Sequence, residues 1–306
     1  MSIIFKIKRR ILQKLFFSKS LSYWQKYGIN ITRNHYYSNI PDLKSLNENN
    51  FKRKIDIIGI DFNEEEQKAL LKRFSKSYRQ EYDAWPKNET ENKYDFHIGQ
   101  TSFRSVDSQI LHCMIRDLKP SVVMEVGSGY TTMITAKALL MNQEETKKGK
   151  AKFTSIEPYP NEVLQKGIPG LDEIIGKGIQ ELPTSYFDVL KENDVLFLDS
   201  THTVKIGGDV NYEILELLPR LNKGVIVHIH DIFLPYEYPE PWITTGERIW
   251  AEQYLLHAFL INNDTYKILW TSHNMFREYP DLLKSEMNYF EEDVPYKGSI
   301  WLQKVK

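Results

Sequence analysis

The chain contains 306 residues, 41% of them hydrophobic and 26% charged, which are ordinary values for a globular protein. Its formal net charge of −1 gives no support to a nucleic-acid partner. The single cysteine, Cys113, excludes an intramolecular disulfide, and the sequence has no apolar run of about 18 residues that would predict a transmembrane helix. We therefore expect a cytoplasmic protein that folds as one large domain with an extension, or as two smaller domains.

The first 20 residues differ in composition from the rest of the chain. They hold six Lys and Arg residues and no acid, with apolar residues between these charges. They lack a long apolar core and a small-residue cleavage site, so we do not expect a signal peptide. The pattern over residues 3–17 is typical of a basic amphipathic helix that contacts a partner or an anionic membrane, here the inner membrane surface. The alternative is a terminal helix that packs on the domain or frays.

Two helices are expected before the first strand. Asp61 and Glu64 have the spacing of a capping box, and the apolar stripe that follows them predicts a helix that buries Ala69, Leu70, Phe74 and Tyr78. Residues 83–104 are polar and predict a loop. A second helix is expected from Ser105 until the chain reaches Pro120. We expect residues 1–104 to form a mainly helical extension, able to cap a site, and residues 105–306 to form the main domain.

After Pro120 the chain alternates between strand and helix patterns. Seven segments have the apolar content of strands: SVVMEVG, KFTSIEP, DEIIGKG, DVLFLDS, KGVIVHIHDI, YKILWTS and GSIWLQKV. A long amphipathic helix is expected over residues 247–263, before the sixth strand. The alternation predicts an α/β fold, with a Rossmann-like, mostly parallel seven-stranded sheet and helices on both faces. The last strand is expected to be antiparallel.

Ligands bind at the carboxyl ends of the strands in such sheets, so polar groups there are candidate site residues. The first strand ends in EVGSGYTT, where Gly127 and Gly129 allow a tight turn and a close ligand. A dinucleotide fingerprint requires a third glycine where this chain has Thr132. Glu125 could receive the ammonium group of a ligand that carries an amino acid, with Ser128 and Thr131 beside it. The alternative is a tight turn without a ligand.

The second and third strand ends complete a candidate nucleoside site. Glu157 can accept hydrogen bonds from both ribose hydroxyls of an adenosine, or it is an exposed acid without a role. Gly178 lies in a loop that could flank the adenine ring, and a plain loop is the equal alternative.

The fourth and fifth strands end in acids and imidazoles. Asp199, His230 and Asp231 are expected to meet at neighbouring strand ends, and this ligand set suits Mg²⁺ or Mn²⁺. An ion there would orient substrate hydroxyls and lower their pKa. Alternatively, His202 or His230 acts as a general base without a metal. A third possibility is that the histidines, including His228, are satisfied core or loop groups.

The loop after Asp231 has the sequence FLPYEYPEPWITTGERIW. It is rich in proline and aromatic residues, which is typical of a substrate lid beside a site and equally of a stiff surface loop.

In order and spacing, MEVGSGYTT, SIEPYP, DVLFLDSTH and GVIVHIHDIF resemble the class I S-adenosylmethionine-dependent methyltransferases. The likeness is greatest to bacterial small-molecule and sugar O-methyltransferases of the macrocin and cephalosporin-biosynthesis-related group, and it covers residues 105–306. The resemblance implies that Glu125, Gly127 and Gly129 lie along the methionine part of the cofactor and that Glu157 holds its ribose.

By the same resemblance, Asp199 borders the cofactor and occupies the position of a metal or substrate acid. Asp231 matches a second metal acid, whereas His230 stands where metal-dependent members often have another carboxylate. The implied reaction is O-methylation of a small molecule or a sugar or polysaccharide precursor, with S-adenosylmethionine as cofactor and Mg²⁺ or Mn²⁺ as a candidate ion. Asp199 and Asp231 would hold the ion or the acceptor, and His202 or His230 would take the proton.

Two rival functions are weighed against this one. A nicotinamide-dependent oxidoreductase has a similar sheet, but the missing third glycine and Glu125 count against it. A non-catalytic cofactor-binding module would not need the row of polar groups at four strand ends. The sequence leaves the acceptor and a homo-oligomeric state open.

Overall fold

The computed structural model describes residues 3–147, 149–246, 248–288, 290 and 297–306. The chain divides into two compact units, Met1–Asn50 and Phe51–Lys306. The boundary therefore lies well before residue 105, where the sequence had predicted the main domain to begin. The reason is that side chains from residues 62–103 belong to the buried cores of the second unit. Within the described part of the chain, no helix is long and apolar enough to cross a membrane.

The first unit consists of short helical segments. They are α1 (Ile3–Phe16), α2 (Leu21–Gln25), the 3-10 helix η1 (Leu43–Ser45) and the start of α3 (Glu48–Lys52). The sequence predicted the first of these, and its polar and apolar residues do lie on a helix.

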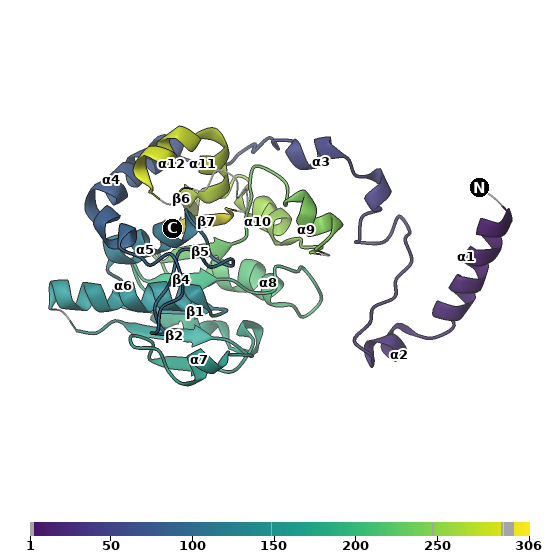
Figure 1. Cartoon of the computed structure of the whole chain (residues 1–306), viewed down its shortest axis with the longest axis horizontal. Coiled ribbons are helices and arrows are strands. Elements are labelled where there is room, and N and C mark those ends of the chain that lie inside the picture. The colour runs from purple at the N-terminus through teal and green to yellow at the C-terminus, as the bar shows by residue number, and fades with distance from the viewer. Residues whose placement is uncertain (1–2, 148, 247, 289, 291–296) are drawn as a thin grey trace. The chain divides into compact units, whose positions relative to one another are not determined.

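The second unit is built on one seven-stranded sheet with the order β3-β2-β1-β4-β5-β7-β6. Figure 1 shows most of these strands stacked in this order, from β6 down to β2. The first five strands pair in parallel, and β7 pairs antiparallel with both β5 and β6. The predicted fold class and the antiparallel last strand are confirmed. The strands are β1 (Val122–Val126), β2 (Lys152–Ile156), β3 (Glu173–Ile175), β4 (Val195–Leu198), β5 (Ile226–His230), β6 (Tyr266–Thr271) and β7 (Ser299–Lys304).

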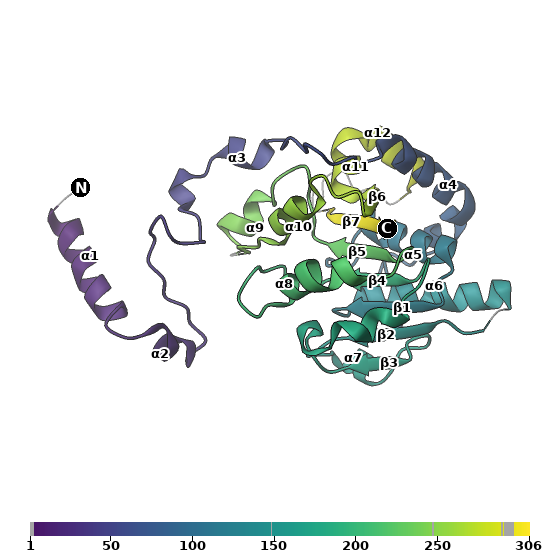
Figure 2. The same cartoon turned by 180° about the vertical axis from the view of Figure 1, so that it is seen from behind.

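Helices cover both faces of the sheet, as Figures 1 and 2 show. Alternate strand residues face two separate buried clusters: Val123 belongs to one and Met124 to the other. The helical elements are α4 (Glu64–Asp83), α5 (Asp107–Leu118), α6 (Tyr130–Thr146), α7 (Glu162–Gln165), η2 (Ile179–Glu181), η3 (Thr184–Val189), α8 (Asp209–Asn211), η4 (Tyr212–Leu217), η5 (Leu218–Arg220), α9 (Glu240–Thr244), α10 (Glu252–Leu260), α11 (Ser272–Glu278) and α12 (Pro280–Glu286).

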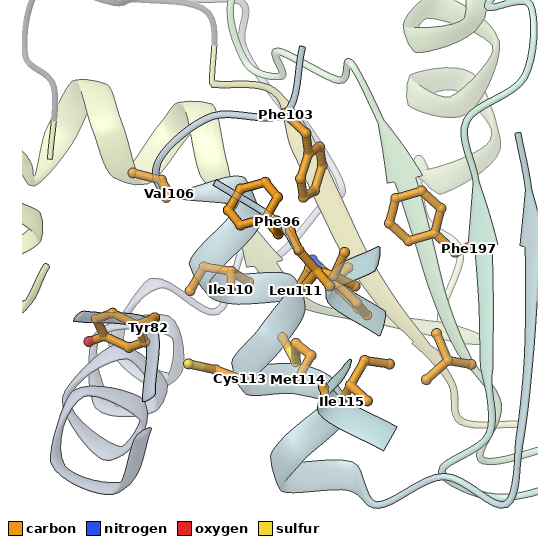
Figure 3. Packing of buried hydrophobic residues seen from close by; sticks show 14 of the residues in the cluster. Tyr82, Phe96, Phe103, Val106, Ile110, Leu111, Cys113, Met114, Ile115 and Phe197 are labelled. Atoms are coloured by element: carbon orange, nitrogen blue, oxygen red, sulfur yellow. The ribbon is translucent and has the colours of Figure 1, made fainter. Parts of the chain in front are cut away.

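The larger cluster centres on α5. Figure 3 shows its apolar side chains packed with Tyr82 of α4 and Phe197 of β4. Cys113 is fully buried there, and burial raises the pKa of its thiol well above the ordinary value. In this position Cys113 is a packing residue.

Local details of α4 differ from the prediction. Asp61 accepts a hydrogen bond from Asn63 N at 2.8 Å, and the helix begins only at Glu64, so the two acids form no capping box. The buried stripe runs through Leu71, Phe74 and Tyr82, whereas Ala69 is exposed. The sequence could not decide which neighbouring stripe faces the core, because both have helical spacing.

Two other elements differ from their predicted extent. The helix expected over residues 247–263, the first of which lies outside the described residues, is confined to α10 (Glu252–Leu260) in the part that the structure describes. Before it, the backbone amides of Ala251 and Glu252 donate to the carbonyl of His202. The polar segment before β7 holds α11 and α12, which the sequence reading missed. Their short apolar stripes pack Met275 and Leu283 into the core.

A charged network joins α4 to α5. Glu81 Oε2 lies 2.7 Å from His112 Nε2, and the Arg116 guanidinium donates to both Glu81 carboxylate oxygens at 2.9 Å. Burial alone would raise the pKa of Glu81, but these hydrogen bonds lower it to about 2. The folded state therefore favours the ionised carboxylate.

We expect Glu81→Gln to lower the free energy of unfolding at neutral pH and to reduce its further decrease at acid pH. The pKa of Glu81 lies below its ordinary value of 4.5, so its contribution is complete above about pH 5 and is lost as the pH falls toward about 2. The shift corresponds to at most about 3 kcal/mol at neutral pH. Urea unfolding at a series of pH values measures it, with exposed Glu65→Gln on the same helix as the control. If the free energy of unfolding decreased equally with falling pH in wild type and in Glu81→Gln, the lowered pKa of Glu81 would be contradicted.

Candidate functional site

A cleft of about 1020 Å³ opens at the carboxyl ends of β1, β4 and β5. This is the edge where the parallel arrangement predicted ligand binding. Its lining comes from five segments: the loop before α5 with Asp107 of that helix, the turn after β1 with the start of α6, the end of β4, the end of β5, and α9 with the loop that leads to α10. The residues are Thr101, Ser102, Phe103, Arg104, Asp107, Ser128, Gly129, Tyr130, Thr131, Asp199, Ser200, Thr201, His202, His230, Asp231, Trp242, Arg248 and Trp250.

The turn after β1 needs glycine at one position and leaves space at another. Gly127 has φ +81°, and a Cβ there would lie 2.4 Å from the carbonyl oxygen of Asp199. Gly129 opens α6, and a Cβ there would meet no atom within 4 Å. The first glycine therefore packs β1 against β4, and the second leaves open space beside the cleft.

Glu125 lies behind this turn and is almost fully buried. One of its carboxylate oxygens accepts a hydrogen bond from the Thr131 hydroxyl. The other, Oε2, has no hydrogen-bond partner among the described residues. Burial raises the pKa of Glu125 to about 8. A buried carboxyl with a vacant oxygen is a ready acceptor for a cationic ligand, because such a ligand would restore its ionised form.

The predicted nucleoside residues lie beside the turn and outside the residues that line the cleft. Glu157 accepts from Tyr159 N at 2.7 Å, and its other oxygen lies 3.4 Å from Ser128 Oγ. Gly178 is farther along, where its amide donates to Glu181 Oε1 at 2.8 Å. Glu157 thus joins the glycine turn through Ser128, whereas the structure shows no contact of Gly178 with the other predicted residues.

The ends of β4 and β5 bring three candidate ligands together. One ligand atom each from Asp199, His202 and Asp231 lies within 4.8 Å of the others. His202 Nε2 is 3.2 Å from Asp199 Oδ1 and 3.7 Å from Asp231 Oδ2. The sequence had grouped Asp199 and Asp231 with His230 instead. His230 Nε2 lies 3.5 Å from Asp231 Oδ1, but His230 is not one of the three residues whose ligand atoms all lie within 4.8 Å of one another.

A buried carboxylate fixes the orientation of His202. Glu252, at the start of α10, has its Oε2 2.7 Å from His202 Nδ1, and only 1% of Glu252 is exposed. With Nδ1–H donating to this carboxylate, Nε2 faces the two aspartates. Burial alone would lower the pKa of His202, but hydrogen bonds to Asp199 and Glu252 raise it well above the ordinary value. Sequence reasoning missed Glu252, because 50 residues separate it from its partner.

The pKa values of the two aspartates are shifted in opposite directions. Burial opposes ionisation of Asp199, but the neighbouring His230 charge and the His202 hydrogen bond lower its pKa. Burial raises the pKa of Asp231 despite the same two imidazoles. These opposite shifts follow from burial and from the charges of the two neighbouring imidazoles.

Backbone conformation also marks this group. His202 has φ +56° and Asp231 has φ +54°, in the left-handed region that side chains rarely adopt. Strain of this kind persists where the surrounding structure holds a functional geometry. His228 fits the core alternative: it is fully buried, stacked on the Phe197 ring at 4.0 Å.

The predicted lid contributes an aromatic wall. The Trp242 and Trp250 rings lie 5.2 Å apart, and the Arg248 guanidinium lies 4.5 Å from the first and 5.2 Å from the second. Trp250 also lies 4.3 Å from the His202 ring. The loop before α5 also lines the cleft, and its Phe103 lies 5.1 Å from the His230 ring. The sequence placed residues 83–104 in a loop but did not predict this wall.

The matches to known proteins fall on the same part of the chain. Residues 124–232 match the model of a family described as a methyltransferase domain. An uncharacterized protein of Archaeoglobus fulgidus is 28% identical over 201 residues, which cover 63% of this chain and 88% of that protein. No activity accompanies that relative.

Two solved structures are similar at a distance. A Podospora anserina methyltransferase with bound S-adenosylhomocysteine is 16% identical, with a TM-score of 0.39, over 78% of this chain and 88% of that one. An O-methyltransferase from Bacillus cereus, also with S-adenosylhomocysteine, is 11% identical, with a TM-score of 0.39, over 77% of this chain and 90% of that one. Similarity this low carries no information on the substrate.

We expect Gly127→Ala to destabilise the protein and Gly129→Ala to leave its stability nearly unchanged. The added methyl group at 127 meets the Asp199 carbonyl in a left-handed backbone, which should cost roughly 1–3 kcal/mol. At 129 the same group meets open space. Thermal and urea unfolding of both variants test the difference, and equal loss of stability would show that the turn is not packed as described.

Proposed function

We propose that this chain, whose residues 124–232 match a methyltransferase domain family, is a class I, S-adenosylmethionine-dependent methyltransferase that methylates a hydroxyl oxygen of a small molecule or of a sugar or polysaccharide precursor. The observation that carries the proposal is the continuity of the cleft. The glycine turn after β1 and the Asp199, His202 and Asp231 group line one cavity, so a methyl donor and an acceptor could meet there.

The turn after β1 supports the cofactor half of the proposal. Glu125 Oε2 is an unpaired buried acceptor suited to the ammonium group of the methionine part. The space at Gly129 lets a ligand approach the backbone, and Glu157 is the acid placed to accept the ribose hydroxyls. When bound, S-adenosylmethionine supplies an electrophilic methyl group on a sulfonium. The residues of this chain would orient it and exclude water.

The aromatic wall supports a ring-shaped acceptor. Trp242 and Trp250 present half-buried indole rings to the cleft, and the faces of such rings pack well against the C–H bonds of sugars or against aromatic rings. Arg248 adds hydrogen-bond donors for oxygen atoms of the acceptor. We propose that the acceptor stacks on this wall with its hydroxyl directed toward Asp199 and Asp231.

The group at the ends of β4 and β5 fits a divalent cation. Two carboxylates and one imidazole whose Nε2 faces both of them are suitable ligands for Mn²⁺, and the carboxylates suit Mg²⁺. We propose that Asp199, His202 and Asp231 hold such an ion, which would lower the pKa of an acceptor hydroxyl. His230 lines the same cleft and is the remaining imidazole to receive the proton.

Calorimetric titration with S-adenosylhomocysteine tests the cofactor site. We expect micromolar binding by wild type, and a loss of at least about tenfold in Glu157→Gln, because one ribose contact disappears. Gly129→Ala should also weaken binding without a change in thermal stability. Glu162→Gln, an exposed acid on α7, is the matched control. No binding by folded wild-type protein would overturn the proposed function.

Titration with Mn²⁺ after treatment with EDTA tests the ion. We expect one site whose affinity falls at least about tenfold in Asp231→Asn, which removes a ligand, and in Glu252→Gln, which weakens the support of His202. Asp264→Asn, an exposed acid outside the cleft, is the control. If wild type binds S-adenosylhomocysteine but no Mn²⁺ or Mg²⁺, then the metal is excluded and His202 becomes the candidate base.

A further inference from the structure

Residues 1–50 carry a charge opposite to that of the rest of the chain. They contain nine Lys and Arg residues and two acids, for a formal charge of +7, and the whole chain has −1, which leaves −8 for residues 51–306. The first 41 residues contain no acid at all. The structure also assigns residues 1–50 to a compact unit of their own. This asymmetry predicts that a negatively charged partner would be contacted through the first unit.

The helix α1 sorts these charges from its apolar residues. Ile4, Ile7, Ile11 and Leu15 follow each other at helical spacing along one side, and each has at least half of its surface exposed. Lys6, Arg9, Arg10 and Gln13 lie on the other side of the helix, and Lys14 lies at the edge of the apolar stripe, one heptad after Ile7. Lys8 lies at the margin of the apolar stripe, where its long side chain can reach outward. The helix contains no acid.

Aromatic residues lie at and after the C-terminal end of α1. The Trp24 indole N–H donates to the carbonyl of Phe16 at 2.9 Å, and the Trp24 and Phe16 rings lie 5.9 Å apart. Tyr23 and Tyr27 of the same segment are exposed. Indole and phenol groups with one apolar and one polar end favour the interface between lipid headgroups and acyl chains.

From these features we infer that α1 docks the protein on an anionic lipid bilayer. Its 14 residues extend about 21 Å, which is less than the hydrocarbon core of about 30 Å, so the helix lies in the plane of the surface and does not cross it. The isoleucine and leucine stripe enters the acyl boundary, and the Lys and Arg side chains remain among the phosphates. The inference goes beyond the proposed reaction and does not depend on it.

A bilayer fits this surface better than an acidic protein or a nucleic acid. A nucleic acid would pair with the Lys and Arg side chains but would leave the apolar stripe in water, and a protein would need an apolar groove bordered by acids to cover both. A bilayer covers the stripe and neutralises the charges together, and the net charge of −8 on the second unit would orient the molecule with the first unit toward the lipid.

Co-sedimentation of the full chain with vesicles tests the inference. We expect binding to vesicles of phosphatidylcholine with roughly 30% phosphatidylglycerol, and at least about tenfold weaker binding to phosphatidylcholine alone. Raising the salt from about 0.1 M to about 0.5 M should weaken the binding. The double variant Ile7→Asp/Ile11→Asp should lose it. The matched control is Ile58→Asp/Leu215→Asp, which places the same charges on exposed apolar residues of the second unit.

An environment-sensitive fluorophore measures the orientation of α1. Cys113 is buried, so a nitrobenzoxadiazole group can be attached selectively to Ile11→Cys or Arg10→Cys. Emission should shift to the blue with anionic vesicles at position 11 and stay nearly unchanged at position 10.

Absence of vesicle binding, equal binding to both lipids, or binding retained by Ile7→Asp/Ile11→Asp would overturn the inference. A lower unfolding temperature of that variant without lipid would also overturn it, because it would show that α1 packs on the protein.

Discussion

The contact between Gly127 and Asp199 is the constraint on which the cleft depends. The parallel pairing of β1 with β4 continues past both strands, where the Asp199 amide donates to the carbonyl of Val126 at 3.0 Å. Because Gly127 has no side chain, its backbone lies against the Asp199 carbonyl. The turn proposed to hold the methyl donor and the aspartate proposed to face the acceptor are thereby parts of one rigid junction. A reaction that needs two groups at a defined distance gains most from such an arrangement.

A second layer of buried acids supports the group around His202. Glu252 orients the imidazole, and Asp209 accepts from both the amide and the hydroxyl of Thr201 at 3.1 and 2.7 Å. Glu213 lies in the π-helical turn η4 and accepts from Ser200 at 3.0 Å. Burial raises the pKa of Glu213 well above its ordinary value. Hydrogen bonds offset part of the cost of burying these carboxyl groups, and burial favours the neutral form of Glu213.

Sequence patterns predicted all seven strands because each has a local signal. Apolar runs that end in Glu125, Asp199 and Asp231 show both where a strand is buried and where it reaches the ligand-binding edge. The choice of His230 as a metal ligand followed from its position beside Asp231 in sequence. In the structure, the left-handed backbone at His202 turns that imidazole toward both aspartates instead. A conformation of this kind has no signature in a single sequence.

The sequence by itself determined the order of strands and helices, the identity of the polar residues at the strand ends and the basic, apolar character of residues 3–17. These follow from composition and periodicity, which act over a few neighbouring residues. Only the tertiary structure decided that Glu252 supports His202, that Trp242 and Trp250 face the same cleft as Gly129, and that residues 51–104 belong to the larger unit. Those contacts join segments far apart in the chain, and they form because the parallel sheet brings its carboxyl ends to one edge.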